Sequence, residues 1–453
     1  MAALPQISMK PEVHEYLRNV FMNKELLMEV EECEAERRFL ALLSCLSRPP
    51  SFTCVRVSTH LAPRHEVQQR LQQYLLQQQS ECSYPGGVSA FPLAHPLLAD
   101  VLLLPVVGPR PVCVLDSEVI VGAQCGNAVL RGAHVFSPGI LSTPKFLKTG
   151  DAVSVFSDVE GKCTKGAKEF KGKKVFLGNG VSRVDRAQIF CTDGPVRGLG
   201  IQMTEPVYSS PSFDGILPEF VFLQNLPSVL VSHVLGPKPG ERILDMCAAP
   251  GGKTTHIAAL IGNKGEVVAL DKISWKVDKI RALAQTLKLD CIRPFCFNSI
   301  RAVSSQADNT ADGPPFLQES FDRVLLDAPC SGLGQRPNMA VTWSLKEICS
   351  YQPLQRKLLH TAVQLLKRGG VLVYSTCTVT LAENEEQVAW ALRTFPCLSL
   401  QAQEPHLGAE GMLGAGLAYD QRLLLQRFHP EPALSGVADR DTIGFFIAKF
   451  TKT

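Results

Sequence analysis

The sequence lacks the features that mark several broad classes of protein. It has no apolar run of the roughly 18 to 20 residues that a membrane-spanning helix needs. Its start, MAALPQISMKPEVHEYLRNV, has neither the basic residues nor the apolar centre of a secretory signal. The 15 Cys include no CxxC pair and no Cys/His cluster with zinc-finger spacing. We therefore expect a cytoplasmic protein without membrane spans, disulfides or a metal site. We also expect a monomer, although the sequence does not reveal the oligomeric state.

The balance of charge excludes a generally basic protein. Lys and Arg number 46 against 43 Asp and Glu, so any basic surface must be local. One such place lies between residues 162 and 174, where six Lys accompany a single Glu. A Lys-rich turn can be a solvated hairpin tip or a phosphate-binding patch. The nearby Arg131 and Gly-rich loops favour the patch, since they would let a nucleic-acid backbone approach.

The chain of 453 residues is too long for one ordinary core and indicates two or three domains. Residues 1–110 have a mixed α/β pattern, with expected helices at 13–30, 34–46 and 65–79 and a strand at 52–57. Residues 111–203 alternate short apolar runs with Gly, which favours a small β-barrel. Residues 204–453 alternate strands with helices.

The alternation in residues 204–453 is the clearest structural pattern in the chain. The expected strands are 241–246, 266–271, 291–298, 321–329 and 370–377, with an edge strand at 443–450. The apolar spacing between them predicts helices at 254–261, 274–287, 354–366 and 383–392. Strands of this apolar density, each followed by a helix, predict a doubly wound parallel sheet.

The segment DMCAAPGGKTTH (residues 245–256) leaves the first of these strands and opens a helix. Its small residues let the main chain approach a ligand, and the helix N-terminus offers free N–H groups. Asp271 ends the next strand, where a carboxylate can accept hydrogen bonds from both hydroxyls of a ribose. Gly252-Lys253-Thr254 also resembles the end of a P-loop, but that motif requires Gly where this chain has Cys247. An adenosyl ligand therefore fits better than a triphosphate.

Two thiols follow the ends of two further strands, in DAPCSG (residues 327–332) and STCT (residues 375–378). Ligands of open α/β sheets bind outside the carboxyl ends of the strands, so Cys330 and Cys377 should face one crevice with the cofactor loop. Cys is often an inert core residue, but these two lie in polar turns. A thiolate that adds to carbon 6 of cytosine makes carbon 5 nucleophilic, and a carboxyl group at the N3 edge assists the addition.

The motifs DMCAAPGGKTTH, VVALD, LLDAPCSG and STCT have the order and spacing found in the Nop/Sun family of RNA cytosine-5 methyltransferases, which residues 204–453 resemble. The segments AVLRGAHVFSPGI and FLKTGDAVSVFSD resemble a PUA domain, a small RNA-binding barrel. The resemblance implies a Rossmann-like class I S-adenosylmethionine methyltransferase domain (204–453), an inserted PUA β-barrel (111–203) and a mixed α/β N-terminal segment (1–110). A barrel in this place is characteristic of a tRNA methyltransferase branch of the family.

Roles for individual residues also come from this resemblance. Cys377 corresponds to the nucleophile, Cys330 to the thiol that assists product release, and Asp327 to the carboxylate at the cytosine edge. The residues corresponding to S-adenosylmethionine contacts are Cys247, Ala248, Ala249, Pro250, Gly251, Gly252, Lys253, Asp271 and Asp327. Lys253 also joins the cofactor loop to the active site. Asn298 stands where the family usually has an acidic residue at the adenine amino group, so we expect weaker cofactor binding there but not lost activity.

The branch also implies a substrate: cytosine 72 in the acceptor stem of cysteine and threonine tRNAs. Arg131 and Lys165 are the expected contacts to the acceptor stem and CCA end, although Thr164 stands where close relatives would have another Lys. A ribosomal RNA methyltransferase and a non-catalytic tRNA-binding protein remain as alternatives. The intact loop, both thiols, Lys253 and Asp327 argue against a decayed site, and the barrel favours tRNA over ribosomal RNA.

Overall fold

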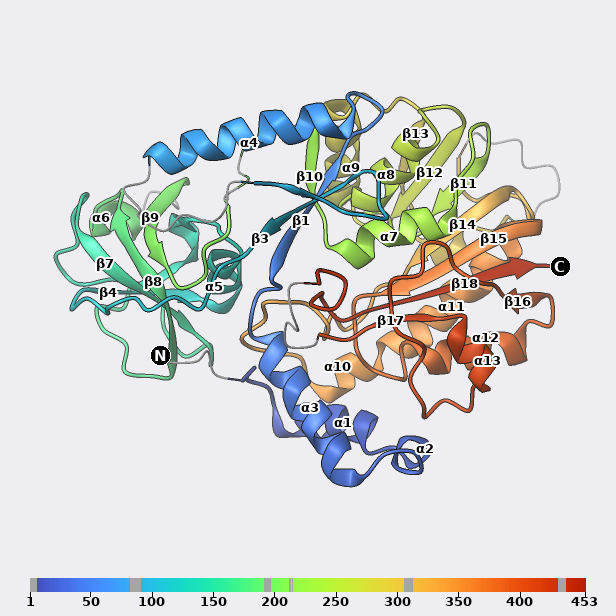
Figure 1. Ribbon diagram of the computed structural model, residues 1–453, viewed down its shortest axis with the longest axis horizontal. Helices are drawn as coiled ribbons and strands as arrows, with labels where there is room; N and C mark the ends of the chain where they lie inside the picture. Colours follow the sequence, from blue (N-terminus) through green and yellow to red (C-terminus); the bar gives the residue numbers. More distant parts are fainter. Residues whose placement is uncertain are drawn as a thin grey trace.

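The computed structural model describes residues 6–81, 91–190, 197–211, 213, 215–304, 313–430 and 437–453. Within these ranges the strands form three sheets. One sheet has six strands and the largest has eight. Figure 1 shows these two sheets at opposite ends of the molecule, with α4 (Arg64–Glu81) running along the upper side from one toward the other. Among the described helices, none has both the length and the apolar character to cross a membrane.

The largest sheet has eight strands in the order β13-β12-β11-β14-β15-β18-β16, with β17 also paired to β18. The strands are β11 (Arg242–Asp245), β12 (Glu266–Asp271), β13 (Ile292–Cys296), β14 (Phe321–Asp327), β15 (Leu366–Thr376), β16 (Leu398–Leu400), β17 (Gln426–Phe428) and β18 (Phe445–Lys452). The first five in the spatial order are parallel, which confirms the five strands predicted from the sequence.

The prediction that the last apolar run is an edge strand is wrong. Strand β18 pairs antiparallel with β15 on one side and with β16 and β17 on the other. Its apolar residues, from Phe445 to Phe450, are almost all buried. The covering strands have three residues each, too short for their periodicity to be recognised in the sequence.

Helices pack on both faces of this sheet. They are α7 (Leu226–Leu235), α8 (Gly252–Leu260), α9 (Ser274–Thr286), α11 (Tyr351–Leu365) and α12 (Glu385–Thr394). Two short helices, α10 (Leu345–Cys349) and α13 (Tyr419–Leu423), lie in the connections of this part of the chain. Successive strand residues point to opposite faces, so Ile243 joins a core with α7, α8 and α9, whereas Leu244 joins another with α11 and α12. The sheet is therefore doubly wound, as predicted.

The six-stranded sheet has the order β5-β9-β8-β7-β4-β6. Its elements are β4 (Glu118–Gly122), α5 (Ala123–Leu130), β5 (Val135–Phe136), η1 (Ser137–Gly139), β6 (Ile140–Ser142), β7 (Ala152–Asp158), β8 (Lys174–Ser182), α6 (Arg186–Ile189) and β9 (Leu199–Pro206). The two end strands, β5 and β6, are joined by the three residues of η1 alone. A sheet whose opposite ends are so close in the chain must roll round on itself, and we call this unit the rolled sheet.

The N-terminal part contains α1 (Pro11–Phe21), α2 (Lys24–Leu27), α3 (Glu32–Leu46), β1 (Phe52–Val57), β2 (Leu93–Ala94) and β3 (Val101–Pro105). The prediction of one helix over 13–30 is wrong. Asn23 interrupts it, because its side chain accepts the Leu26 N–H at 3.0 Å and starts a new helix. The third sheet has the order β10-β1-β3-β2, and β10 (Val221–Leu223) comes from beyond the rolled sheet. The chain thus leaves this sheet, forms the rolled sheet and returns.

Candidate active site

The loop between β11 and α8 is held against the neighbouring strand. The N–H of Ala248 donates to the Leu270 carbonyl at 2.9 Å, and that of Gly251 donates to the Ala248 carbonyl at 2.7 Å. Gly251 has a φ of +107°, which residues with a side chain rarely adopt. The turn delivers the chain directly into α8, whose first N–H groups are then available to a ligand.

Asp245 lies at the base of this loop. One of its oxygens accepts the Thr254 hydroxyl at 2.7 Å, while its buried Oδ1 has no hydrogen-bond partner among the described residues. Burial raises the pKa of Asp245 to about 7. Burial also raises the pKa of the Cys247 thiol, which makes that cysteine a poor nucleophile.

Asp271 and Asn298 lie next to each other at the carboxyl edge. Asp271 ends β12 and is paired with Cys296, two residues before Asn298. The Asp271 carboxylate accepts the Ile273 N–H at 2.9 Å. The exposed Asn298 uses its carbonyl oxygen to accept the Ile300 N–H at 3.2 Å, at the start of η2 (Ser299–Arg301). A carbonyl oxygen has two lone pairs, so one remains for a ligand.

The two thiols meet at the same edge of the sheet. Sγ of Cys330 lies 3.4 Å from Sγ of Cys377. This proximity follows from the register of β14 and β15, which pairs Asp327 with Ser375 and so carries both cysteine turns off the sheet together. The two thiols therefore lie together at one edge of the sheet, and their sharing one crevice with the cofactor loop stays a prediction.

The environment of the pair makes one thiol more acidic than the other. The pKa of Cys377 is lowered by a hydrogen bond from Cys330, with help from a Gln335 hydrogen bond and the Lys253 charge, although burial opposes the shift. The same contact, together with burial, raises the pKa of Cys330. Cys377 is therefore the thiol that ionises first, as a nucleophile must.

Lys253 and Asp327 join the cofactor loop to the thiol edge. Nζ of Lys253 lies 2.7 Å from Oδ2 of Asp327, and the Ser375 hydroxyl donates to Oδ1 at 2.7 Å. The Lys253 side chain is 11% exposed. The pair thus connects the cofactor loop to the strand end before Cys330, and both side chains line the cavity described below.

Comparison with known proteins agrees with this geometry. A family model described as 16S rRNA methyltransferase RsmB/F matches residues 232–451. The human tRNA (cytosine(72)-C(5))-methyltransferase NSUN6 is 59% identical over 100% of this chain and 99% of that protein. The chain belongs to the Nop/Sun family of RNA cytosine-5 methyltransferases. The rRNA (cytosine-C(5))-methyltransferase NOP2C of Arabidopsis thaliana is 31% identical over 99% of this chain and 91% of that protein.

A solved structure extends the Nop/Sun likeness to the fold. The crystal structure of NSun6 from Pyrococcus horikoshii with SFG, an S-adenosylmethionine analogue, matches with a TM-score of 0.76 and 28% identity over 98% of each chain. The chain has the class I methyltransferase fold, and its cofactor is S-adenosylmethionine. The residues present fit that group: the unpartnered Oδ1 of Asp245 is an acceptor, the α8 N-terminus offers donors, and Asp271 can take the ribose hydroxyls.

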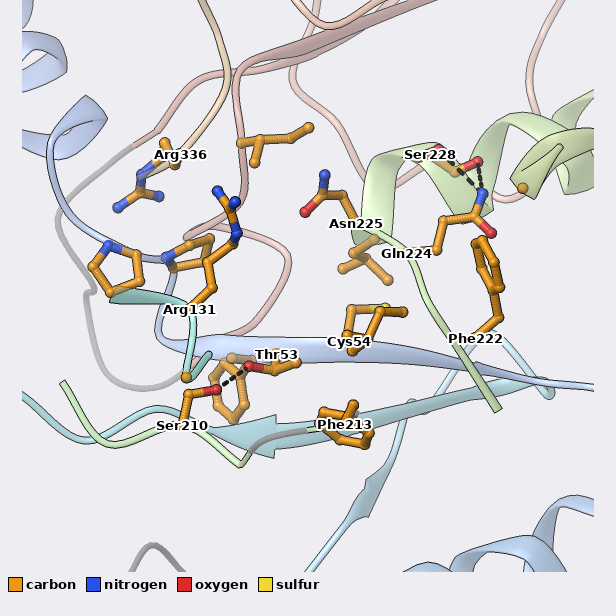
Figure 2. A pocket seen from close by; sticks show the side chains of 18 of the residues that line it. Thr53, Cys54, Arg131, Ser210, Phe213, Phe222, Gln224, Asn225, Ser228 and Arg336 are labelled. Carbon is orange, nitrogen blue, oxygen red and sulfur yellow. Dashed lines mark hydrogen bonds between the residues drawn. The ribbon is translucent and has the colours of Figure 1, made fainter. Parts of the chain in front are cut away.

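A cavity of about 880 Å³ extends from the cofactor loop to the rolled sheet. It is lined by loop residues, by Lys253 and Asp327, and at its far end by Arg131, the residue that follows α5. Figure 2 shows Arg131 directed into this space, with Arg336 close by. The lining does not include Cys330, Cys377, Asp271 or Asn298. The cavity therefore meets the thiol edge through Lys253 and Asp327.

The Lys cluster lies around the connection between β7 and β8 and is partly neutralised. Lys162 pairs with Glu160 at 2.9 Å, Lys171 pairs with Glu169 at 3.0 Å, and Lys174 pairs with Glu118. Lys165 is exposed there and is not part of the cavity lining. The structure thus brings Arg131 to the cavity but leaves Lys165 outside it.

Sequence reasoning missed the N-terminal support of the cofactor helix. The buried Arg56 of β1 donates to the Gly252 carbonyl at 2.5 Å and to the Thr255 hydroxyl at 3.0 Å. Apolar residues of α1 and α3 also pack against Leu333 and Val379, which follow the two thiols in the chain. These contacts join positions far apart in the sequence, so no local signal could have revealed them.

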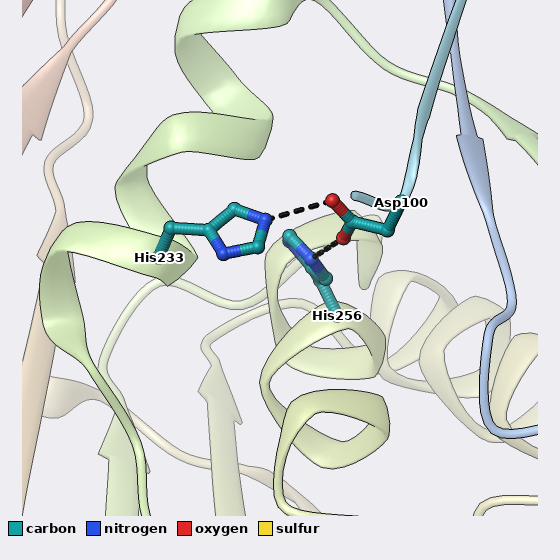
Figure 3. A group of neighbouring side chains, drawn as sticks. All are labelled: Asp100, His233 and His256. Carbon is teal, nitrogen blue, oxygen red and sulfur yellow. Dashed lines mark hydrogen bonds and ion pairs between the residues drawn. The ribbon is translucent and has the colours of Figure 1, made fainter. Parts of the chain in front are cut away.

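A second missed contact is the cluster of Asp100, His233 and His256 (Figure 3). One Asp100 oxygen lies 2.8 Å from Nε2 of His233 and the other lies 2.6 Å from Nε2 of His256. The three side chains come from the turn before β3 and from α7 and α8. They fasten the N-terminal sheet to the helix that follows the cofactor loop.

Proposed function

We propose that this protein transfers a methyl group from S-adenosylmethionine to carbon 5 of cytosine 72 in the acceptor stem of tRNA. The observation that carries the proposal is the 3.4 Å distance between the Cys330 and Cys377 sulfurs beside the Lys253–Asp327 pair. The substrate follows the 59% identity, over the whole chain, with the human enzyme named for cytosine 72 of tRNA. By resemblance, cysteine and threonine tRNAs are the proposed targets.

Cys377 begins the proposed reaction. Its lowered pKa makes a thiolate available, which adds to carbon 6 of the cytosine and makes carbon 5 nucleophilic. Asp327, paired with Lys253, is the proposed group at the N3 edge, where a proton carried by its carboxyl group to N3 would offset the negative charge that develops on the ring. Residues 247–253, Asp271 and Asn298 would hold S-adenosylmethionine, which would supply the methyl group on a positively charged sulfur.

Cys330 assists the release. After methylation, carbon 5 carries both a hydrogen and the new methyl group. Loss of that proton to a base lets the carbon 6–sulfur bond break, and the electron pair of that bond returns to Cys377. The raised pKa of Cys330 keeps its thiol protonated, so it can donate to the departing sulfur and exchange protons with it.

The rolled sheet is the proposed RNA-binding PUA domain, within the predicted boundaries 111–203. Its rolled shape and the Arg131 side chain in the cavity support contact with the CCA end and acceptor stem. Positive charge from exposed Lys residues, Lys165 included, would attract the phosphate backbone. A monomer in the cytoplasm remains our expectation for the working state.

A ribosomal RNA substrate is the second candidate, because the Arabidopsis relative named as an rRNA methyltransferase also matches over 99% of this chain. Its 31% identity, against 59% for the human tRNA enzyme, favours tRNA. A binding protein without activity would not need the complete set of Cys330, Cys377, Asp327 and Lys253.

The test combines two variants with tRNA and ribosomal RNA transcripts. Cys377→Ala should abolish methyl transfer while tRNA binding persists. Cys330→Ala should accumulate a covalent protein–RNA adduct, visible as a slow band on a denaturing gel. Transfer of label to ribosomal RNA alone would favour the second candidate, and full activity of Cys377→Ala would exclude the mechanism.

A further inference from the structure

Glu383, on the segment between β15 and α12, has a carboxylate that the reaction above does not use. The residue is 1% exposed, yet no cation pairs with it among the described residues. Burying a carboxylate without a counter-ion costs free energy unless several donors compensate. Burial raises the pKa of Glu383, and hydrogen bonds from Ser331, Thr380 and Gln355 oppose the shift.

One of those donors belongs to the turn that contains Cys330. Ser331, the next residue, donates its N–H to Oε2 of Glu383 at 2.9 Å and its hydroxyl to Oε1 at 2.6 Å. The Gln355 amide donates to Oε2 at 3.1 Å and to the Pro329 carbonyl at 3.0 Å. The carboxylate therefore fixes this turn on both sides of Cys330.

The second thiol turn reaches the same carboxylate. Oγ1 of Thr378, which follows Cys377, lies 2.8 Å from Oγ of Ser331. Because the single hydroxyl proton of Ser331 goes to Glu383, Thr378 is the donor in this contact. Thr380, two residues further, donates directly to Oε1 at 3.0 Å. One buried group thus holds the residues that follow both thiols.

We propose that Glu383 is a positioning residue that keeps Cys330 beside Cys377, so that the release step follows attack without rearrangement of the two turns. It touches neither thiol nor substrate and acts through Ser331 and Thr378. An apolar side chain at position 383 could not hold the two turns in the same way, since the buried Ser331 N–H and Gln355 amide need a hydrogen-bond acceptor there. The expected effect on turnover rests on the proposed function. The arrangement of the two turns does not, and it can be tested without RNA.

The first experiment measures thiol proximity in the full-length protein. Diamide oxidises two thiols to a disulfide and is itself reduced to the hydrazine, so the rate of Cys330–Cys377 bond formation reports how well the turns are held. Glu383→Leu should slow this rate about ten- to a hundredfold, because it removes the acceptor but keeps the volume. Glu383→Gln, which keeps a carbonyl for Ser331, should restore much of it. Glu386→Leu, three residues further along in the first turn of α12, is the matched control and should not change it.

The second experiment measures turnover on a tRNA transcript, normalised to the fraction of protein that binds S-adenosylmethionine. Glu383→Leu should lower kcat by a similar factor, leave both KM values within about twofold and accumulate the covalent adduct. If Glu383→Leu does not fold, Ser331→Ala can be used instead, because it removes the hydroxyl that bonds both Glu383 and Thr378. It should slow disulfide formation, lower kcat and accumulate the adduct, each to a smaller extent. Wild-type disulfide rates and wild-type normalised kcat in these variants would overturn the proposal. Failure of the wild-type protein to methylate any RNA, with slowed disulfide formation in Glu383→Leu, would instead reject the proposed function alone.

Discussion

Nζ of Lys253 lies 2.7 Å from Oδ2 of Asp327, so a residue of the cofactor helix and a residue of the cytosine edge share one ion pair. Lys253→Met and Asp327→Asn should each lower kcat/KM about a hundredfold or more, because each removes charge from the place where charge develops. The kcat/KM of the double variant should be little lower than that of the less active single variant, since the two residues act as a unit. Methyl-transfer kinetics check this, and strictly additive losses would mean that the residues act independently.

The cofactor affinity should rise when the acidic residue usual in the family is restored. Asn298→Asp keeps an acceptor for the Ile300 N–H and adds charge to the bond with the adenine amino group. We expect binding of S-adenosylmethionine to tighten about three- to tenfold, measured by calorimetry. Asn298→Ala is the control and should weaken it. Equal affinities for all three proteins would place Asn298 outside the cofactor contacts.

Three cationic residues of the rolled sheet should differ in their effect on tRNA binding. Lys165→Glu should weaken binding and reduce the salt slope by about one phosphate contact. Arg131→Glu should weaken binding more, because Arg131 lines the cavity. Lys171 is already paired with Glu169, so Lys171→Glu is expected to have the smallest effect. Binding measured over a range of salt concentrations separates these cases, and an unchanged slope for Lys165→Glu would make the Lys cluster a solvated hairpin tip.

The stability of the protein should fall on mild acidification. Burial lowers the pKa of His256 to about 4, against 6.5 as a reference, so unfolding takes up a proton between these values. Stability is therefore present above pH 6.5 and lost as the pH falls toward 4, by about 2 kcal/mol between pH 7 and 5. The pKa of Asp100 is lowered as well, since the hydrogen bonds from His233 and His256 outweigh burial, and this adds a loss at still lower pH.

Thermal unfolding at pH 7 and pH 5 checks this expectation. His256→Gln should narrow the difference in Tm between the two conditions, because Gln does not titrate. His65→Gln, at an exposed position, is the matched control and should retain the wild-type difference. An equal difference in all three proteins would contradict the assignment to His256.

Much of the large sheet could be predicted because its information is local. Each expected parallel strand is a short apolar run that ends at or near an Asp, Asn, Cys or Thr. The carboxyl ends of parallel strands lie at the same edge of their sheet. That rule alone predicts that Cys330 and Cys377 lie together. It also brought Lys253 near Cys377, where its charge lowers the pKa of the thiol.

What could not be predicted depends on contacts across the fold. Glu383 is only five residues beyond Thr378 but 52 residues beyond Ser331, and only the parallel pairing of β14 and β15 makes Glu383 and Ser331 neighbours. Arg56 reaches Gly252 across 196 positions. The break at Asn23 was missed because helical apolar spacing continues through it, while the cap is a property of one side chain.

The rolled sheet enters and leaves through β3 and β10, which flank the same strand, β1, in a single sheet. Both ends of the inserted unit are thus connected to strands of one sheet, and Arg56 of that sheet hydrogen-bonds the first turn of α8. Two such connections restrict the movement of the rolled sheet more than a single linker would. An RNA bound by the rolled sheet would therefore lie at a fixed distance from Cys330 and Cys377. That distance would determine which of its nucleotides reaches the two thiols.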